Sequence, residues 1–307
     1  MTRTAAISPI PVAPELWLIP LPQAMPGFEA FICAWLVTGK HTLLIDVGPS
    51  ATAPLLIRSL QAAGVRALDA ILLTHIHIDH SGGIGEVAAA FAAAPVVCHT
   101  RAMAHLVDPE KLWQGSRKTL PEIADIYGPI APVPQERLIA AEDFKACAVV
   151  SVPTPGHASH HVSYWREGDL FAGEAGGVYQ ALDGGGHYLR PATPPRYDLD
   201  IHLESLARLE ALDSRRICYG HFGAAGAVSN RLAEHRRQLC LWRDILAAYA
   251  GDADGGTGMG DMLGHLLRVD PLMAHWERLP PNVRQRETGF LMNSIRGMCG
   301  YLAGARS

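Results

Sequence analysis

The sequence has 307 residues, of which 49% are hydrophobic and 18% are charged, as is typical of a globular protein with a large buried core. Its formal net charge of −4 disfavours nucleic acid as the main partner, and its basic clusters are short. No apolar stretch is long enough for a membrane span, and the N-terminal segment lacks the apolar run of a signal peptide, so we expect a cytoplasmic protein with no membrane partner.

The first third of the chain predicts strands alternating with helices. Three short apolar runs, ELWLIPL, FEAFICAWLV and HTLLIDVG, predict strands between residues 16 and 48. Apolar residues at helical spacing then predict a helix from about Thr52 to Ala63, which Gly64 ends. ALDAILLTH predicts a buried strand, GGIGEVAAAFAAA a helix, and PVVCHT a further strand.

The alternation becomes less regular after residue 100. We expect a helical stretch over roughly 100–128 and an amphipathic helix over 198–212, capped by Asp198 or Asp200. Four runs predict strands: VVSVPT (149–154), HVSYW (161–165), DLFAG (169–173) and RRICYG (215–220). Together these elements predict a mixed α/β layered domain to about residue 225.

The C-terminal part of the chain has a different pattern. Residues 228–250 predict a long helix, the Gly/Asp-rich segment 251–261 a flexible linker, and residues 262–303 more helix, broken at Pro280-Pro281. We therefore divide the chain into an N-terminal α/β domain, 1–225, and a C-terminal helical extension, 226–307.

The six cysteines, at positions 33, 98, 147, 218, 240 and 299, are scattered and form no Cys-x-x-Cys pair. Several of them lie in apolar runs such as FICAWLV. We therefore expect buried free thiols in a reducing compartment rather than disulfides or a zinc finger.

The stretch THIHIDHSGG, residues 74–83, places three histidines and an aspartate within six positions after an apolar strand. Side chains alternate along a strand, so His75 and His77 share a face, and the following turn brings Asp79 and His80 toward the same place. Imidazoles and a carboxylate are ligands that suit zinc, iron or manganese. A cluster of solvated loop residues is a poorer explanation of this spacing.

Three later segments supply further potential ligands, each passing from a strand into a glycine-containing loop. They are TPGHASHH with His157, FAGEAGG with Glu174 and CYGHFG with His221. For His160 and His161 we favour packing over ligation. Asp46, in LLIDVG, either orients a ligand histidine or is a strand-end turn residue, and both interpretations stay open.

The motifs HIHIDH, TPGH, FAGE and YGHFG resemble those of the metallo-β-lactamase superfamily, in its glyoxalase-II-like branch, over about residues 15–225. The resemblance implies a four-layer αββα sandwich with two divalent ions at one edge, zinc or alternatively iron or manganese. It implies a first ion on His75, His77 and His157, a second on Asp79, His80 and His221, and Glu174 as the bridging carboxylate. The family usually has aspartate where this chain has Glu174.

The resemblance also implies a metal-dependent hydrolase. A hydroxide between the ions, made acidic by their charge, would attack a small ester, lactone or thioester. Asp79 and His80 are the candidate catalytic residues, and we expect Asp79 to accept a proton or to position the nucleophile. The alternative, kept open by Glu174, is a non-haem di-iron protein acting in redox or oxygen chemistry or in sensing.

Other polar residues near these motifs are less specific. For Tyr179 and Tyr188 we favour a role in packing, and the alternative is that one of them contacts an oxyanion. His187, in a glycine-rich loop, faces the cleft or packs, and His105 covers the site or packs. We expect a small-molecule substrate, with Met25 and Phe28 of the connector 20–30 as an apolar lip, and a homodimer stays open.

Overall fold

A seven-stranded sheet forms the N-terminal half of the protein in a computed structural model that describes residues 5–221, 223–249 and 258–304. Its strands pair antiparallel from β1 to β4 and parallel from β4 to β7. In spatial order they are β1 (Ile10–Ala13), β2 (Leu16–Pro20), β3 (Cys33–Val37), β4 (Leu43–Ile45), β5 (Ala70–Leu72), β6 (Val96–Cys98) and β7 (Leu138–Ala140).

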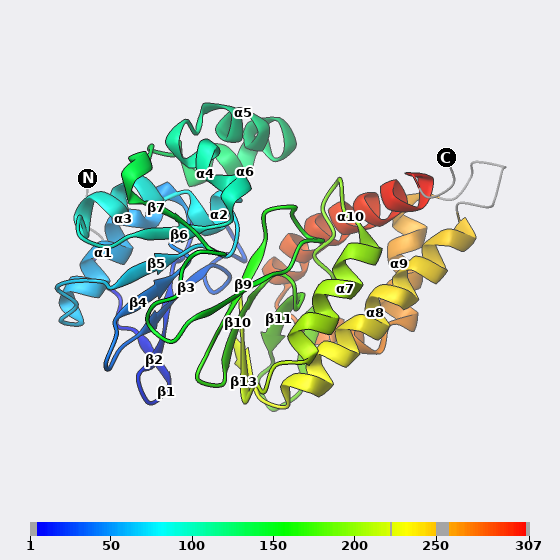
Figure 1. Ribbon diagram of the computed structural model, residues 1–307. Helices are drawn as coiled ribbons and strands as arrows, with labels where there is room; N and C mark the ends of the chain where they lie inside the picture. The colour runs from blue at the N-terminus through cyan, green and yellow to red at the C-terminus, as the bar shows by residue number, and fades with distance from the viewer. Residues whose placement is uncertain (1–4, 222, 250–257, 305–307) are drawn as a thin grey trace.

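A second sheet of five strands faces the first, and a hairpin lies beside it (Figure 1). In spatial order its strands are β14 (Ala224–Ala225), β13 (Arg216–Tyr219), β10 (Asp169–Gly173), β9 (Val162–Arg166) and β8 (Val150–Pro153). The central strands β10 and β13 are parallel, so both run toward the same edge. The hairpin pairs β11 (Val178–Ala181) with β12 (His187–Arg190).

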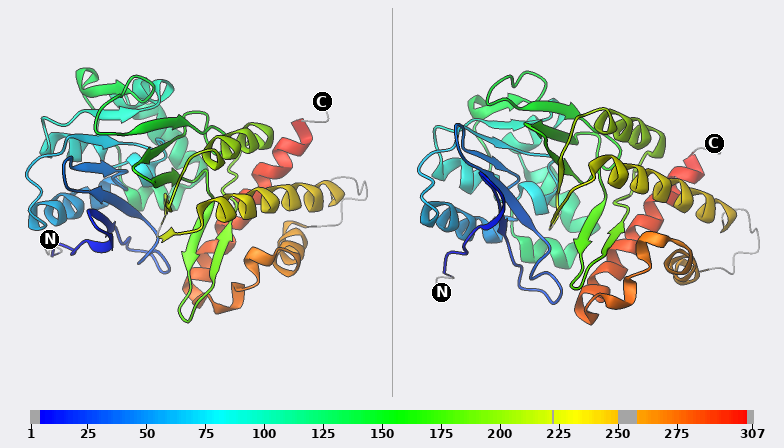
Figure 2. Two further views of the ribbon diagram at one scale, coloured as in Figure 1. Left: turned by 60° about the horizontal axis from the view of Figure 1, so that its bottom comes forward. Right: turned by 90° about the horizontal axis from the view of Figure 1, so that it is seen from below.

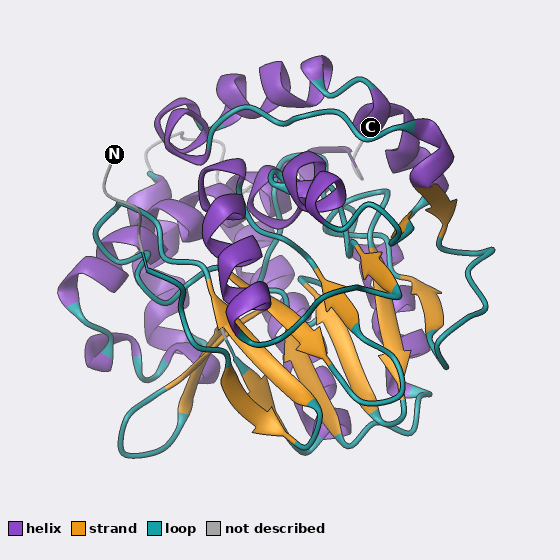
Figure 3. Cartoon of the chain, turned by 90° about the vertical axis from the view of Figure 1, so that its left-hand side faces the viewer, coloured by secondary structure: helices purple, strands orange, loops and turns teal. Residues whose placement is uncertain are grey.

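Helices cover the outer face of each sheet (Figures 1 and 3). Those on the N-terminal side are α1 (Ala53–Ala62), α2 (Ile78–Ser81), α3 (Ile84–Ala90), α4 (Thr100–Val107), α5 (Glu110–Thr119) and α6 (Pro121–Tyr127). Those on the other side are α7 (Leu199–Glu210), α8 (Val228–Tyr249), α9 (Met259–Val269) and α10 (Pro281–Gly304). Short 3₁₀ turns are η1 (Ser50–Thr52), η2 (Gln135–Arg137), η3 (Pro271–Met273) and η4 (Trp276–Arg278).

Three buried clusters separate these layers, because successive strand residues face opposite sides of a sheet. Ile19 packs under the N-terminal helices, whereas Leu18 packs between the two sheets. Phe171 also lies between the sheets, and its neighbour Leu170 packs with Trp242 of α8. The alternation produces the expected αββα sandwich.

Most of the predicted elements are present, and the differences are local. The helix expected over 82–94 covers only Ile84–Ala90, and a separate turn of helix, α2, precedes it. The loop around Gly184–Gly186 belongs to the β11–β12 hairpin, with all three glycines at positive φ. Residues 251–257 of the predicted linker lie outside the described residues, while 259–261 already belong to α9.

The C-terminal helices pack on the sandwich through the same cluster as the second sheet (Figure 2). Leu239 of α8 and Ile295 of α10 share that cluster with Ile217 of β13 and Leu206 of α7. The boundary at residue 225 stays a prediction. Among the described residues the cysteines are unpaired, and no helix is both long and apolar enough to cross a membrane.

Candidate metal centre

The stretch 74–83 leaves the first sheet at the end of β5, which stops at Leu72. His75 and His77 therefore lie in the loop after the strand rather than on the strand itself. Their rings still meet, with Nε2 of His75 3.1 Å from Nδ1 of His77. His77 is the residue before α2, and this single turn of helix carries Asp79 and His80.

The second sheet supplies the opposite wall. His157 lies in the loop between β8 and β9, Glu174 directly follows β10, and His221 lies two residues beyond the end of β13. Because β10 and β13 are neighbouring parallel strands, their ends meet at one edge of the sheet. An isolated bridge between Ile32 and His221 ties that edge to the first sheet.

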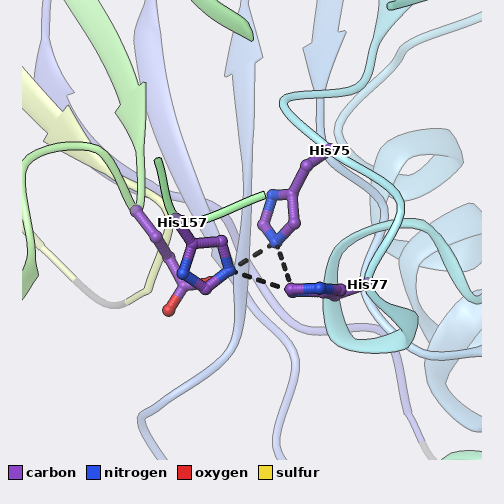
Figure 4. Close-up of side chains that lie close together, drawn as sticks. His75, His77 and His157 are labelled. Carbon is purple, nitrogen blue, oxygen red and sulfur yellow. Dashed lines mark hydrogen bonds and ion pairs between the residues drawn. The ribbon is translucent and has the colours of Figure 1, made fainter. Parts of the chain in front are cut away.

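Four side chains form the first ligand group: His75, His77, His157 and Glu174, each offering an atom within 4.8 Å of the others. Figure 4 shows the three imidazoles turned toward one point. Nε2 of His157 lies 2.9 Å from Nδ1 of His77 and 2.8 Å from Oε2 of Glu174. These are the residues that the resemblance assigns to the first ion, together with the bridging carboxylate.

Three side chains form the second group: Asp79, His80 and His221, again within 4.8 Å. Oδ2 of Asp79 lies 3.8 Å from Nε2 of His80 and 3.9 Å from Nε2 of His221. The Asp79 side chain is 20% exposed, whereas both histidines are buried. Asp79 is therefore the candidate ligand on the solvent side of this group.

Glu174 contacts both groups. Its Oε2 lies 3.4 Å from Nε2 of His75 and 3.7 Å from Nε2 of His80, while Oε1 lies 3.1 Å from Nε2 of His221. A bulge between Phe171 and Gly173 re-aims the chain just before this residue. The glutamate side chain is thus placed where a carboxylate can bridge two ions.

Polar groups behind the ligands fix their orientation. His80 donates from Nδ1 to Asp46 Oδ2 at 2.9 Å, and Asp46 also accepts from the amide and hydroxyl of Thr74. His75 Nδ1 lies 3.1 Å from the Thr74 hydroxyl, and His157 donates from Nδ1 to the Ala192 carbonyl at 2.9 Å. Asp46 both orients the ring of His80 and occupies the turn, with φ of 55°. No local pattern in the sequence points to Thr74 or Ala192.

His161 supports the loop that carries Glu174. It is fully buried, accepts from the amide of Glu174 at Nε2 and donates from Nδ1 to the Thr154 hydroxyl. His161 therefore packs inward, and its partly exposed neighbour His160 lies outside both ligand groups. The geometry agrees with packing rather than ligation for these two histidines.

Burial and neighbouring charges set the protonation of the ligands in the metal-free protein. Burial lowers the pKa of His75 and His77 well below the usual value, and adjacent histidines lower it further. Burial also opposes charge on His80, yet Asp79, Asp46 and Glu174 together raise its pKa to about 9. Burial likewise disfavours the Glu174 carboxylate, but His157 and His221 hold its pKa well below the usual range.

The donor set fits divalent ions such as zinc. Imidazole nitrogens and carboxylate oxygens, with no thiolate, suit zinc, iron or manganese. Nε2 of His80 is buried with no hydrogen-bond partner among the described residues, and it faces the carboxylates of Asp79 and Glu174. A buried nitrogen left in this way is expected of a ligand atom.

The remaining predicted residues lie apart from the two groups. Tyr179 stacks on Tyr219, with ring centroids 4.7 Å apart, and on His187. Tyr188 is buried, and His105 is an exposed residue of α4. Phe28 is only 6% exposed and packs edge-on against Phe31, so it is not the apolar lip expected at 20–30.

Comparisons with known proteins show the family to which the chain belongs. The protein is 28% identical over 261 residues to the metallo-beta-lactamase fold-containing protein ST1585 of Sulfurisphaera tokodaii, which covers 81% of this chain and 93% of the relative. Its crystal structure, that of an archaeal metallo-beta-lactamase superfamily protein, superposes with a TM-score of 0.64 at 25% identity, over 92% of this chain and 98% of the other.

Two further relatives are named as enzymes. One is an atrochrysone carboxyl ACP thioesterase of Aspergillus fumigatus, 24% identical over 81% of this chain and 69% of the relative. The other is a hydroxyacylglutathione hydrolase of Dechloromonas aromatica, 30% identical over 46% of this chain and 42% of the relative. The family model of the metallo-beta-lactamase superfamily matches residues 31–221, which hold both ligand groups. The chain therefore belongs to the metallo-beta-lactamase superfamily.

Proposed function

We propose that this protein is a dinuclear, metal-dependent hydrolase of a small ester, lactone or thioester. The observation that carries the proposal is the position of Glu174, whose two carboxylate oxygens face both ligand groups. His75, His77 and His157 would hold one ion, and Asp79, His80 and His221 the other. Zinc is the proposed metal, because five of the seven donors are imidazoles, and iron is the alternative that the same donors allow.

Ions held at these positions would supply a Lewis acid and make a coordinated water a nucleophile near neutral pH. Side chains of the protein would hold the centre together and orient the water. Glu174 would hold the two ligand groups at a fixed separation, and Asp46 would hold the ring of His80 through Nδ1. Asp79, the more exposed carboxylate, would orient the attacking water and accept its proton.

The names of two relatives favour a thioester within this substrate class. One is named a thioesterase and the other a hydroxyacylglutathione hydrolase, and both are remote in sequence. The negative formal charge of the chain supports a small substrate over a nucleic acid. A panel of different substrate classes therefore tests which bond the protein hydrolyses.

The test combines elemental analysis with lactone, thioester, ester and phosphodiester substrates. We expect about two ions per chain and turnover of a carbonyl substrate, which His80→Ala lowers at least about 100-fold because it removes a ligand. His41→Ala is the matched control, since His41 is partly exposed and lies outside both ligand groups. Stoichiometric iron with a visible absorption band and no turnover of any carbonyl substrate would overturn the hydrolase proposal.

A further inference from the structure

His221 is held differently from three other histidines of the centre. His75, His80 and His157 each place their second ring nitrogen against an oxygen atom at 2.9 to 3.1 Å. Nδ1 of His221 is buried and has no hydrogen-bond partner among the described residues. A hydrogen bond on the far nitrogen usually fixes the plane of a ligand imidazole, so another contact must do so here.

An aromatic ring lies against the His221 imidazole. Phe31 stacks on it with a centroid separation of 4.1 Å and an interplanar angle of 12°. The same short segment holds the His221 backbone, because Ile32 bridges to it and the Cys33 thiol donates to its carbonyl oxygen at 3.1 Å. Phe31 is 2% exposed, so its ring is held in place by the surrounding packing, unlike a mobile surface side chain.

The opposite face of Phe31 is covered by an arginine from the C-terminal helix. The guanidinium carbon of Arg286, in α10, lies 4.0 Å from the Phe31 centroid. Arg286 donates to Glu287 at 3.0 Å and to the carbonyl oxygen of Gly27, which fixes the plane of its head group. Glu287 is fully buried and also pairs with Arg190, so the cluster keeps one salt bridge without Arg286.

The start of α10 is fitted closely to the connector that carries Phe31. A Cβ on Gly27, which has φ of 86°, would lie 2.4 Å from the Asn282 carbonyl oxygen. Phe290, one turn beyond Arg286, packs 5.3 Å from Phe31. The order of contacts is therefore α10, Arg286, Phe31 and then His221, and all three side chains are buried.

We propose that Phe31, clamped by Arg286 of α10, is the positioning residue that fixes the His221 ring and with it the second metal position. The inference rests on the proposed dinuclear centre. It makes the C-terminal helix part of that centre, although no residue of α10 belongs to either ligand group. Stacking takes the place of the missing hydrogen bond, and the cation–π contact of Arg286 holds Phe31 in the plane that this stacking needs.

Titration of the metal-free full chain with cobalt(II) ions tests this proposal, because it measures the affinity of each metal position without a substrate. We expect Phe31→Leu and Arg286→Met to weaken the second ion about tenfold and to leave the first within about twofold. Arg286→Lys, which keeps a cation over the ring, should recover most of the loss. Arg286→Met gives the answer if Phe31→Leu fails to fold, because Arg190 still pairs with Glu287.

The matched control is Phe28→Leu. Phe28 lies in the same cluster, edge-on to Phe31 at 5.4 Å, and does not stack on His221, so we expect it to leave both affinities unchanged. Equal loss in Phe28→Leu, or wild-type affinity in both test variants, overturns the positioning role while the hydrolase proposal stands. A wild-type chain that binds a single ion overturns the dinuclear centre and this inference together.

Discussion

Glu174 shows at the scale of one residue how a longer side chain can face both groups of candidate ligands. Its carboxylate reaches His157 at 2.8 Å and His221 at 3.1 Å, on opposite sides of the centre. The bulge before Gly173 and the His161 acceptor beneath the Glu174 amide place the backbone for this reach. The departure from the family's aspartate is therefore accommodated by the local backbone.

Glu174→Asp should weaken the centre although it keeps the charge. The side chain loses one methylene, so a carboxylate on the same backbone cannot face both groups. We expect about tenfold weaker binding of one ion and a lower kcat on the best substrate of the panel. Metal titration and steady-state kinetics measure this; two ions bound as in wild type would show that the extra methylene is dispensable.

At the scale of elements, the centre depends on how β10 ends. Gly173 has φ of 56°, and a Cβ there would lie 2.3 Å from Nε2 of His161. A run such as FAGE predicts a strand followed by a turn. It does not reveal that a buried histidine from the β8–β9 connection fills the space beneath, because that contact depends on how β9 pairs with β10.

Gly173→Ala should destabilise the protein by about 2 to 4 kcal/mol, through the left-handed backbone and the collision with His161. Gly115→Ala is the control: Gly115 lies exposed in α5 with nothing near its Cβ position, so the free energy of unfolding should rise by up to about 1 kcal/mol. Urea denaturation of both metal-free variants measures the difference. Equal stability of Gly173→Ala and wild type would contradict the steric argument.

At the scale of the whole molecule, buried histidines join the C-terminal helices to the sandwich. His235 of α8 is fully buried and packs 5.7 Å from His202 of α7, which bonds to the Ala175 carbonyl beside Glu174. Burial and then His202 lower the pKa of His235 to about 3, from an ordinary 6.5. The packing of α8 therefore requires a neutral His235.

This requirement predicts a pH dependence of folding. The unfolded chain takes up a proton on His235 more readily than the folded protein does. The stabilising contribution of neutral His235 is therefore complete above pH 6.5 and is lost as pH falls toward 3. In metal-free protein, His235→Leu should reduce the loss of unfolding free energy between pH 7 and pH 5 by about 2 kcal/mol. Urea denaturation at both values tests this, and an identical loss in variant and wild type would refute it.

The local pattern of residue types predicted much of the fold and of the candidate metal centre. Short apolar runs ending in glycine turns predicted most of the strands, and histidines after them predicted candidate ligands, whose side chains the structure brings together. These features are readable because strand alternation and metal chemistry act on neighbouring residues. Short pairings such as β11 with β12 escaped, since three or four residues carry little periodicity.

Tertiary structure alone decided what stands behind the ligands. The Asp46 carboxylate against His80, the Ala192 carbonyl against His157, and Phe31 with Arg286 against His221 join segments from 34 to more than 250 residues apart. Such contacts follow from how the layers stack, so no window of the sequence contains them. The candidate ligands were readable from the chain itself, whereas their orientation depends on packing that reaches the C-terminal helix.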